Sequence, residues 1–149
     1  MKLFWMVFFI FSLFLFINGC GNALTGDVVK NEEIYENGIK AQVYFCPKYD
    51  CNKVLTKFAN NAEKSLHCAF YDLNLEDLIN AIAAKSHTAD VKVVVFKENY
   101  DGQIKGPGVK AIGSRHYMHN KFCVSDGKIV LTGSTNPTCN DANLNNNNI

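Results

Sequence analysis

A histidine and a lysine two positions apart, His119 and Lys121, are the residues of this chain whose types and spacing most clearly indicate chemistry. In an extended strand the side chains of alternate residues lie on the same face, so an imidazole and an ammonium group would share one surface. A histidine can act as nucleophile, base or acid near neutral pH. Each residue alone is also common on protein surfaces, so the interpretation depends on what accompanies the pair.

A hairpin is predicted directly after this pair. Asp126-Gly127 favours a tight turn because glycine accepts a positive φ, and residues 128–132 have the composition of a returning strand. That strand leads to Gly133, Ser134 and Asn136. It would bring backbone N–H groups, a hydroxyl and an amide back toward the histidine, an arrangement that suits a bound phosphate.

Read as one stretch, the sequence is His-x-Lys, four residues, Asp, six residues, Gly-Ser-x-Asn. This pattern resembles the HKD motif of the phospholipase D superfamily. The resemblance is strong over residues 118–136 and topological over the rest of 41–149. It is greatest to the single-motif branch, which contains small exported bacterial endonucleases and the membrane-anchored Zucchini-type mitochondrial nuclease or cardiolipin hydrolase.

The resemblance implies roles for individual residues and a mechanism. His119, Lys121 and Asp126 would be catalytic, whereas Gly133, Ser134 and Asn136 would bind the substrate phosphate. Phosphodiesters would be hydrolysed through a phosphohistidine, with no metal or other cofactor. Because Asp126 lies at the turn, we expect it to orient the hairpin or remain solvated rather than touch substrate.

A single motif also predicts a homodimer. A nucleophilic histidine needs a second group that protonates the leaving alkoxide and then activates water. A symmetric dimer would supply the second His119 across its two-fold axis, and the resemblance implies the same pairing.

Three functions remain open: an endonuclease that cleaves DNA or RNA, which we prefer, a hydrolase of cardiolipin-like phospholipid, and a phosphate-binding module without turnover. The net charge of +1 argues against nucleic-acid binding by bulk basicity. Residues 92–121, however, hold six Lys or Arg against two Asp or Glu. Within this segment Arg115 and His116 are the candidates for contact with a substrate phosphate.

The N-terminus is strongly apolar. Residues 3–17 form an almost unbroken apolar run behind Lys2, and Asn18-Gly19-Cys20 follows it. We interpret residues 1–20 as a hydrophobic helix that serves as signal peptide or membrane anchor, with Cys20 as a lipidation candidate because it resembles a lipobox cysteine. An uncleaved anchor and an ordinary cleaved signal are the alternatives. Each predicts export, with the protein either anchored to the membrane or secreted.

The remaining sequence divides into a linker, residues 21–39, and one domain, residues 40–149. Residue periodicity predicts strands at 41–45, 65–71 and 91–96 and helices at 52–64 and 75–85, the second capped by Asn74. This order predicts an α/β fold, a mixed β-sheet with helices packed on it. Residues 97–117 are expected to be a glycine-rich loop, and the Asn-rich end after Asn136, without a predicted helix or strand, suggests a C-terminally truncated domain.

The cysteines allow several states. Cys46 and Cys51 are close enough in sequence to pair across a turn, and we prefer a disulfide or free thiols there to a zinc site. Cys68 and Cys123 lie in apolar strand patterns and are interpreted as buried core residues.

Overall fold

The protein is built on a mixed five-stranded sheet, seen in a computed structural model that describes residues 32–106 and 108–149. The strands lie in the order β6 (Val109–Ile112), β5 (Asp90–Phe96), β4 (Ser65–Phe70), β7 (Lys121–Ser125) and β8 (Ile129–Thr132). β4, β5 and β6 are parallel, whereas β7 is antiparallel to both of its neighbours. The predicted α/β fold with a mixed sheet is therefore confirmed.

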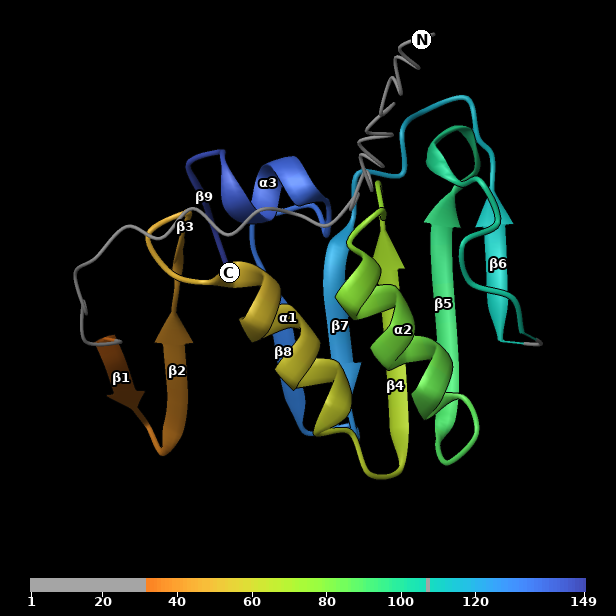
Figure 1. Ribbon diagram of the computed structural model, residues 1–149. Coiled ribbons are helices and arrows are strands. Elements are labelled where there is room, and N and C mark those ends of the chain that lie inside the picture. The colour runs from red at the N-terminus through yellow and green to blue at the C-terminus, as the bar shows by residue number, and fades with distance from the viewer. Residues whose placement is uncertain (1–31, 107) are drawn as a thin grey trace, which may run out of the picture.

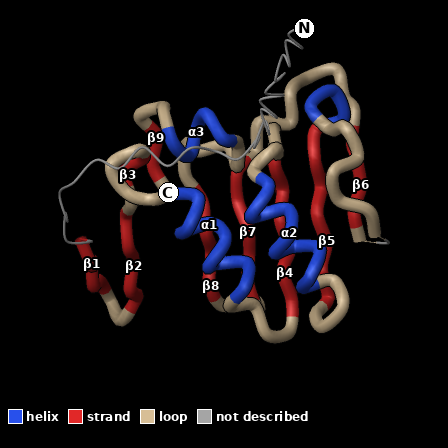
Figure 2. Tube along the Cα trace, in the orientation of Figure 1, coloured by secondary structure: helices blue, strands red, loops and turns tan. Residues whose placement is uncertain are grey.

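Helices α1 (Cys51–Asn60) and α2 (Glu76–Lys85) lie side by side on one face of this sheet (Figures 1 and 2). The core lies between these two layers. β4 buries alternate residues, Leu66, Cys68 and Phe70, as a strand covered on one face must. Each large apolar side chain buried in this way stabilises the fold by roughly 1.5–3 kcal/mol.

The two helices begin and end differently from the prediction. Asp50 caps α1 by accepting a hydrogen bond from the Lys53 N–H, and α1 ends at Asn60 rather than at residue 64. Asn74 is not the N-cap of α2, because α2 is preceded by Leu75, which makes no side-chain cap bond. The Asn74 amide oxygen instead accepts a hydrogen bond from the Cys139 N–H and so ties the C-terminal segment to this loop.

The N-terminal part of the described chain is a hairpin. The predicted anchor at residues 1–20, its Cys20 and the first part of the linker lie outside the described residues. Linker residues 32–38 were expected to be irregular, but β1 (Glu32–Glu36) pairs with β2 (Ile39–Val43) in antiparallel fashion. Asn37-Gly38, both with positive φ, makes the turn, and this dipeptide is the signal that the sequence reading missed.

No helix within the described residues has the length and apolarity needed to cross a membrane.

Two other segments expected to lack regular structure contain short elements. The loop 97–117 includes the 3-10 helix η1 (Lys97–Asn99) and strand β6. After Asn136 the chain forms α3 (Cys139–Asn143) and then β9 (Asn147–Asn148), which pairs with β3 (Phe45–Cys46). Thr138 caps α3 through its hydroxyl, a signal that the Asn-rich composition obscured.

Two disulfides connect described residues. Cys46 and Cys51 are bonded, which is one of the two states that the sequence left open. Cys68 and Cys123 are also bonded, whereas they were expected to be plain core residues. The two lie directly opposite each other on β4 and β7, a proximity that depends on strand pairing and is not visible in the sequence.

Asp126 connects the turn between β7 and β8 to the loop between α1 and β4. With a positive φ, it directs its carboxylate at the N–H groups of Glu63, Lys64 and Ser65, at 2.7 to 3.2 Å. The Ser65, Glu63 and Lys64 N–H groups lower the pKa of this carboxyl to about 2. The contact also accounts for the early end of α1, since the residues after Asn60 are held by the turn instead of continuing the helix.

We predict that Asp126→Asn lowers the stability of the fold and reduces its acid sensitivity. Because the folded pKa is below the ordinary value, the ionised carboxylate stabilises the native state above about pH 4 and loses that effect as the pH falls toward about 2. Denaturant unfolding at several pH values measures this. Asp101→Asn, at an exposed residue whose carboxylate caps no loop, is the matched control. Equal pH dependence in wild type and Asp126→Asn would contradict the role of Asp126.

Candidate active site

The candidate site lies at one edge of the sheet, namely the one formed by the strand ends at the top of Figure 1. The parallel strands β4 and β5 end there, and the antiparallel β7 begins there. In open α/β sheets, the carboxyl ends of parallel strands are where ligands commonly bind. The hairpin β7–β8 returns the chain to the same edge at Thr132, directly before the Gly-Ser-x-Asn segment.

His119 and Lys121 are in contact at this edge. The Lys121 Nζ lies 3.0 Å from the His119 Nε2, although β7 begins only at Lys121 and His119 precedes it. Because an ammonium group only donates, the Nε2 atom is the acceptor and carries a lone pair. The predicted shared face of the two side chains is thus observed, and the pair brings a ring nitrogen next to a positive charge.

Tyr71, the residue that follows β4, positions both members of the pair. Its ring centroid lies 4.7 Å from that of His119 in an edge-on arrangement, and the Lys121 Nζ lies 5.2 Å from the same centroid. The Tyr71 N–H donates to the Asn120 carbonyl at 2.8 Å, which continues the pairing of β4 with β7 beyond the strand. The residue between His119 and Lys121 is therefore fixed by Tyr71, whose ring also supports both side chains.

The pKa of Lys121 is shifted from its ordinary value. Partial burial lowers the pKa of its ammonium group, and the carboxylates of Asp141 and Asp72 partly oppose this by favouring the charged form. A lysine with a lowered pKa beside a histidine, at the edge where strands end, has the properties of a functional residue.

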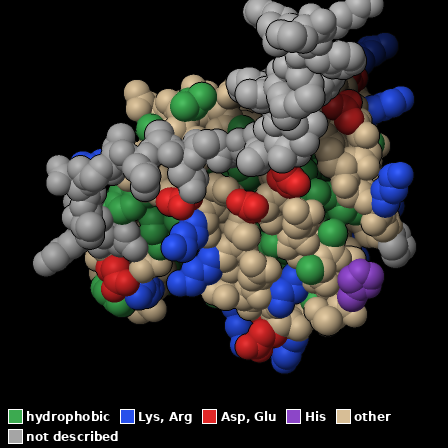
Figure 3. Space-filling view, in the orientation of Figure 1, with side chains coloured by type: hydrophobic (Ala, Val, Ile, Leu, Met, Phe, Trp, Pro, Cys, Tyr) green, Lys and Arg blue, Asp and Glu red, His purple; other side chains and the backbone are tan. Residues whose placement is uncertain are grey.

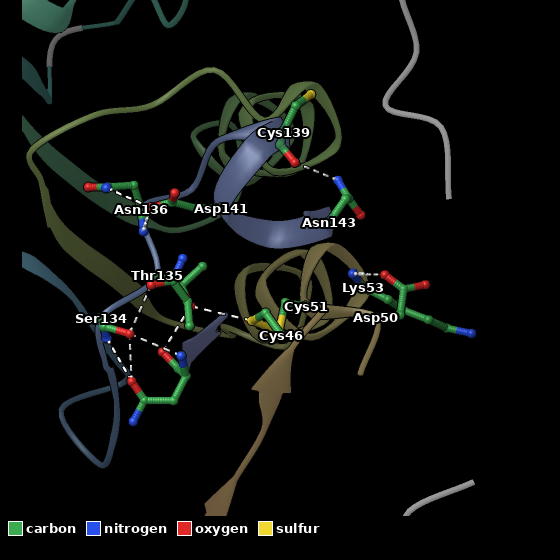
Figure 4. Close-up of a disulfide and its surroundings, with 12 residues drawn as sticks. Cys46, Asp50, Cys51, Lys53, Ser134, Thr135, Asn136, Cys139, Asp141 and Asn143 are labelled. Atoms are coloured by element: carbon green, nitrogen blue, oxygen red, sulfur yellow. Dashed lines mark hydrogen bonds between the residues drawn. A yellow bond between two sulfur atoms is a disulfide. The ribbon is translucent and has the colours of Figure 1, made fainter. Parts of the chain in front are cut away.

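Asn136 and Asp141 form the second polar pair of the site. The Asn136 backbone N–H and its Nδ2 both donate to the Asp141 Oδ2, at 2.9 and 2.7 Å (Figure 4). Burial raises the pKa of Asp141. Hydrogen bonds from Asn145 and Asn136 and the charge of Lys121 have the opposite and larger effect, so the pKa is lowered and the carboxylate stays ionised. The Asn136 Oδ1 is buried and has no hydrogen-bond partner in the described structure.

Gly133 and Ser134 contact the C-terminal strand instead of forming an open cradle. The Ser134 Oγ donates to the Asn148 Oδ1 at 2.7 Å, and its backbone N–H also points to Asn148. A Cβ on Gly133 would come within 2.2 Å of the Asn148 carbonyl oxygen, so only glycine permits this approach. The predicted phosphate-binding role of these two residues is therefore not visible in their contacts here.

The other predicted site residues are not at the centre of the site. Asp126, grouped with the catalytic residues, lies at the opposite edge of the sheet, where it holds residues 63–65. This is the orienting role that its place in the turn predicted. Arg115 and His116 are exposed in the loop before His119, where the His116 N–H donates to the Ser114 hydroxyl.

Sequence reasoning missed Tyr71 and Asp141. Tyr71 had a signal, since an aromatic residue directly after a buried strand lies at the edge where ligands bind. The sequence held little indication of the role of Asp141, because this role depends on the fold of a C-terminus that was expected to be irregular. Within residues 32–106 and 108–149, no group of three or more His, Cys, Asp or Glu side chains is arranged as metal ligands.

Comparison with protein families gives a match over most of the domain. A family model described as "Cardiolipin synthase, PLD-like domain" matches residues 55–149. The mitochondrial cardiolipin hydrolase of Xenopus tropicalis is 35% identical over 98 residues, which cover 59% of this chain and 46% of that protein. The Xenopus laevis protein is 37% identical over 87 residues, covering 52% and 41%. The match thus spans less than half the length of these relatives.

Two solved structures share the fold. One is a phospholipase D family member, Nuc, from Salmonella typhimurium, with a TM-score of 0.62, 22% identity and coverage of 72% of this chain and 78% of that one. The other is NucT from Helicobacter pylori, with a TM-score of 0.60, 22% identity and coverage of 71% and 80%. At this level of identity the likeness establishes the arrangement of the elements.

We predict that Asp141→Asn lowers the pKa of Lys121 further. The substitution removes the carboxylate that has the larger effect on the pKa of Lys121, while an amide oxygen remains that can accept from Asn136. Titration of the Lys121 side chain by heteronuclear NMR measures the shift. Asp72→Asn should have a smaller effect and Asp101→Asn none. An unchanged Lys121 titration in Asp141→Asn would show that the two groups are not coupled.

Proposed function

We propose that this chain, which belongs to the PLD-like domain family, is a phosphodiesterase that uses His119 as its nucleophile. The observation that carries the proposal is the 3.0 Å contact between the His119 Nε2 and the Lys121 Nζ at the ligand-binding edge of the sheet. The contact supports this role because it holds a ring nitrogen of the histidine next to a cation that can neutralise a phosphate oxygen.

The chemistry follows from these groups. The His119 Nε2 attacks phosphorus, a P–N bond forms, and the bond from phosphorus to the leaving alkoxide breaks while that alkoxide takes a proton from an acid. Lys121 and the Asn136 amide stabilise the charge on the phosphoryl oxygens, which strengthens as the transition state is reached. Water then attacks phosphorus, loses a proton to the same second group, and the P–N bond breaks.

We infer that the second group is the His119 of another copy, so that the active species is a homodimer with its site on the two-fold axis. Among the described residues no other histidine has a lysine two positions later. His119 is exposed, so its imidazole is accessible to a second copy of the chain.

For the substrate we prefer nucleic acid, with the chain acting as an endonuclease on DNA or RNA. The excess of basic residues between 92 and 121 supports this choice, because this segment leads directly into His119 and Lys121. The face that carries α1 and α2 is less suitable, since basic and acidic side chains are interspersed on it (Figure 3).

Cardiolipin-like phospholipid is the second candidate. The curated relatives are described as cardiolipin hydrolases, and the apolar N-terminal run would place the site near a membrane surface. Export with membrane anchoring or secretion is part of the proposal in either case. A phosphate-binding module without turnover is the remaining alternative, and the next experiment distinguishes it.

His119→Ala is expected to reduce phosphodiester cleavage by several orders of magnitude, because removal of a nucleophile abolishes the covalent route. Cleavage of a labelled single-stranded oligonucleotide and of cardiolipin vesicles measures the effect and identifies the substrate. His87→Ala, at an exposed histidine after α2, is the control and should be fully active. Near-normal turnover by His119→Ala would refute the nucleophile assignment, and no turnover by wild type would favour the binding module.

Mixing wild-type and His119→Ala chains tests the dimer. Random pairing of equal amounts gives about half mixed dimers, each with one histidine at the shared site. If both are required and subunits exchange freely, total activity should fall to about a quarter of that of an all-wild-type sample at the same chain concentration. A fall to only one half would mean that each chain works alone.

A further inference from the structure

An exposed tyrosine adjoins the candidate active site and has no part in the chemistry described above. Tyr117, two residues before His119, is 75% exposed. Its ring is nevertheless held by two others, edge-on to Tyr71 at a centroid distance of 6.0 Å and edge-on to Phe96 at 5.7 Å. Tyr71 and Phe96 stack on each other at 5.6 Å, and Phe96 is only 2% exposed. Tyr117 is thus an exposed ring that rests on a buried phenylalanine and a half-buried tyrosine.

This support connects Tyr117 to the reacting group. Tyr71 contacts the rings of both Tyr117 and His119, so the two share one aromatic neighbour. The Asn99 Nδ2 donates to the Tyr71 carbonyl at 3.0 Å, which holds this neighbour in place. A group lying on Tyr117 would therefore belong to the part of the substrate next to the phosphate that His119 attacks.

We propose that Tyr117, supported by Tyr71 and Phe96, is a subsite that stacks a nucleobase adjacent to the cleaved phosphodiester. The inference rests on the proposed phosphodiesterase function and names its substrate class, single-stranded nucleic acid. Bases in a duplex are stacked on one another, whereas an unpaired base offers a free face to an aromatic side chain.

The surroundings of Tyr117 favour a base over an acyl chain. Residues 111–117 are all exposed, and the three residues before Tyr117, Ser114 to His116, are polar. Arg115, two positions away, can contact a neighbouring phosphate. An aromatic ring beside a cation is the combination that single-stranded nucleic-acid sites use, whereas an acyl chain needs a concave apolar surface.

The test compares two single-stranded oligomers of equal length, one of ordinary nucleotides and one of abasic tetrahydrofuran residues with the same phosphates. Tyr117→Ala should raise the KM for the ordinary oligomer about tenfold or more, with little change in kcat, and leave the abasic oligomer unaffected. Tyr117→Phe, which keeps the ring, should remain within about twofold of wild type.

Tyr35→Ala is the matched control, because Tyr35 is 67% exposed in the separate β1–β2 hairpin, and it should change neither substrate. Loss of activity on both oligomers in Tyr117→Ala would mean that Tyr117 only supports His119, and no loss on either would exclude a contact. Either result would overturn the proposed base-stacking subsite.

Two further outcomes separate this inference from the proposed function. Wild type that cleaves neither oligomer nor cardiolipin vesicles would refute the phosphodiesterase proposal and the subsite with it. If Tyr117→Ala instead impairs hydrolysis of the vesicles alone, the function stands and Tyr117 contacts lipid, which overturns the base-stacking subsite.

Discussion

The antiparallel pairing of β7 with β4 is the interaction on which the candidate site depends. It places Lys121 opposite Phe70 and, one step further, bonds the Tyr71 N–H to the Asn120 carbonyl. A slip of one residue would move Lys121 to the other face of the sheet. The register is held by the Cys68–Cys123 disulfide in the middle of the pair and, at the far edge, by Asp126, whose N–H donates to the Ser65 carbonyl.

A few partly buried polar groups beside these paired strands determine the chemical properties of the site. Lys121 is desolvated enough to lower its pKa, while the negative charge of Asp141 acts in the opposite direction and favours the charged form. Asp141 in turn fixes Asn136 through two hydrogen bonds. One carboxylate from the C-terminal segment thus orients an amide and tunes a cation, and this links the Asn-rich end of the chain to the function of the motif.

The sequence predicted the parts of the fold whose signals are local. The periodicity of residues 51–96 gave the alternating helices and strands, and the His-x-Lys spacing gave the contact between His119 and Lys121. The parts that were wrong depend on pairing across long distances. Cys68 and Cys123 form a disulfide only because their strands are neighbours, and residues 147–148 form a strand only because β3 is available. The Asn37-Gly38 turn was readable, and the residues after it alternate, but Glu32–Glu36 before it lack the apolar alternation that normally marks a hairpin.

The central claim, nucleophilic catalysis by His119, is tested most directly by trapping the covalent intermediate. Wild-type protein would be mixed with a single-stranded oligonucleotide in excess EDTA, quenched with alkali during turnover, and measured by intact-protein and peptide mass spectrometry. The account predicts a phosphoryl-linked fragment on His119 that disappears as the reaction completes and is absent from His119→Ala. Turnover without an adduct, an adduct on another residue, or cleavage that requires added Mg²⁺ or Zn²⁺ would contradict it.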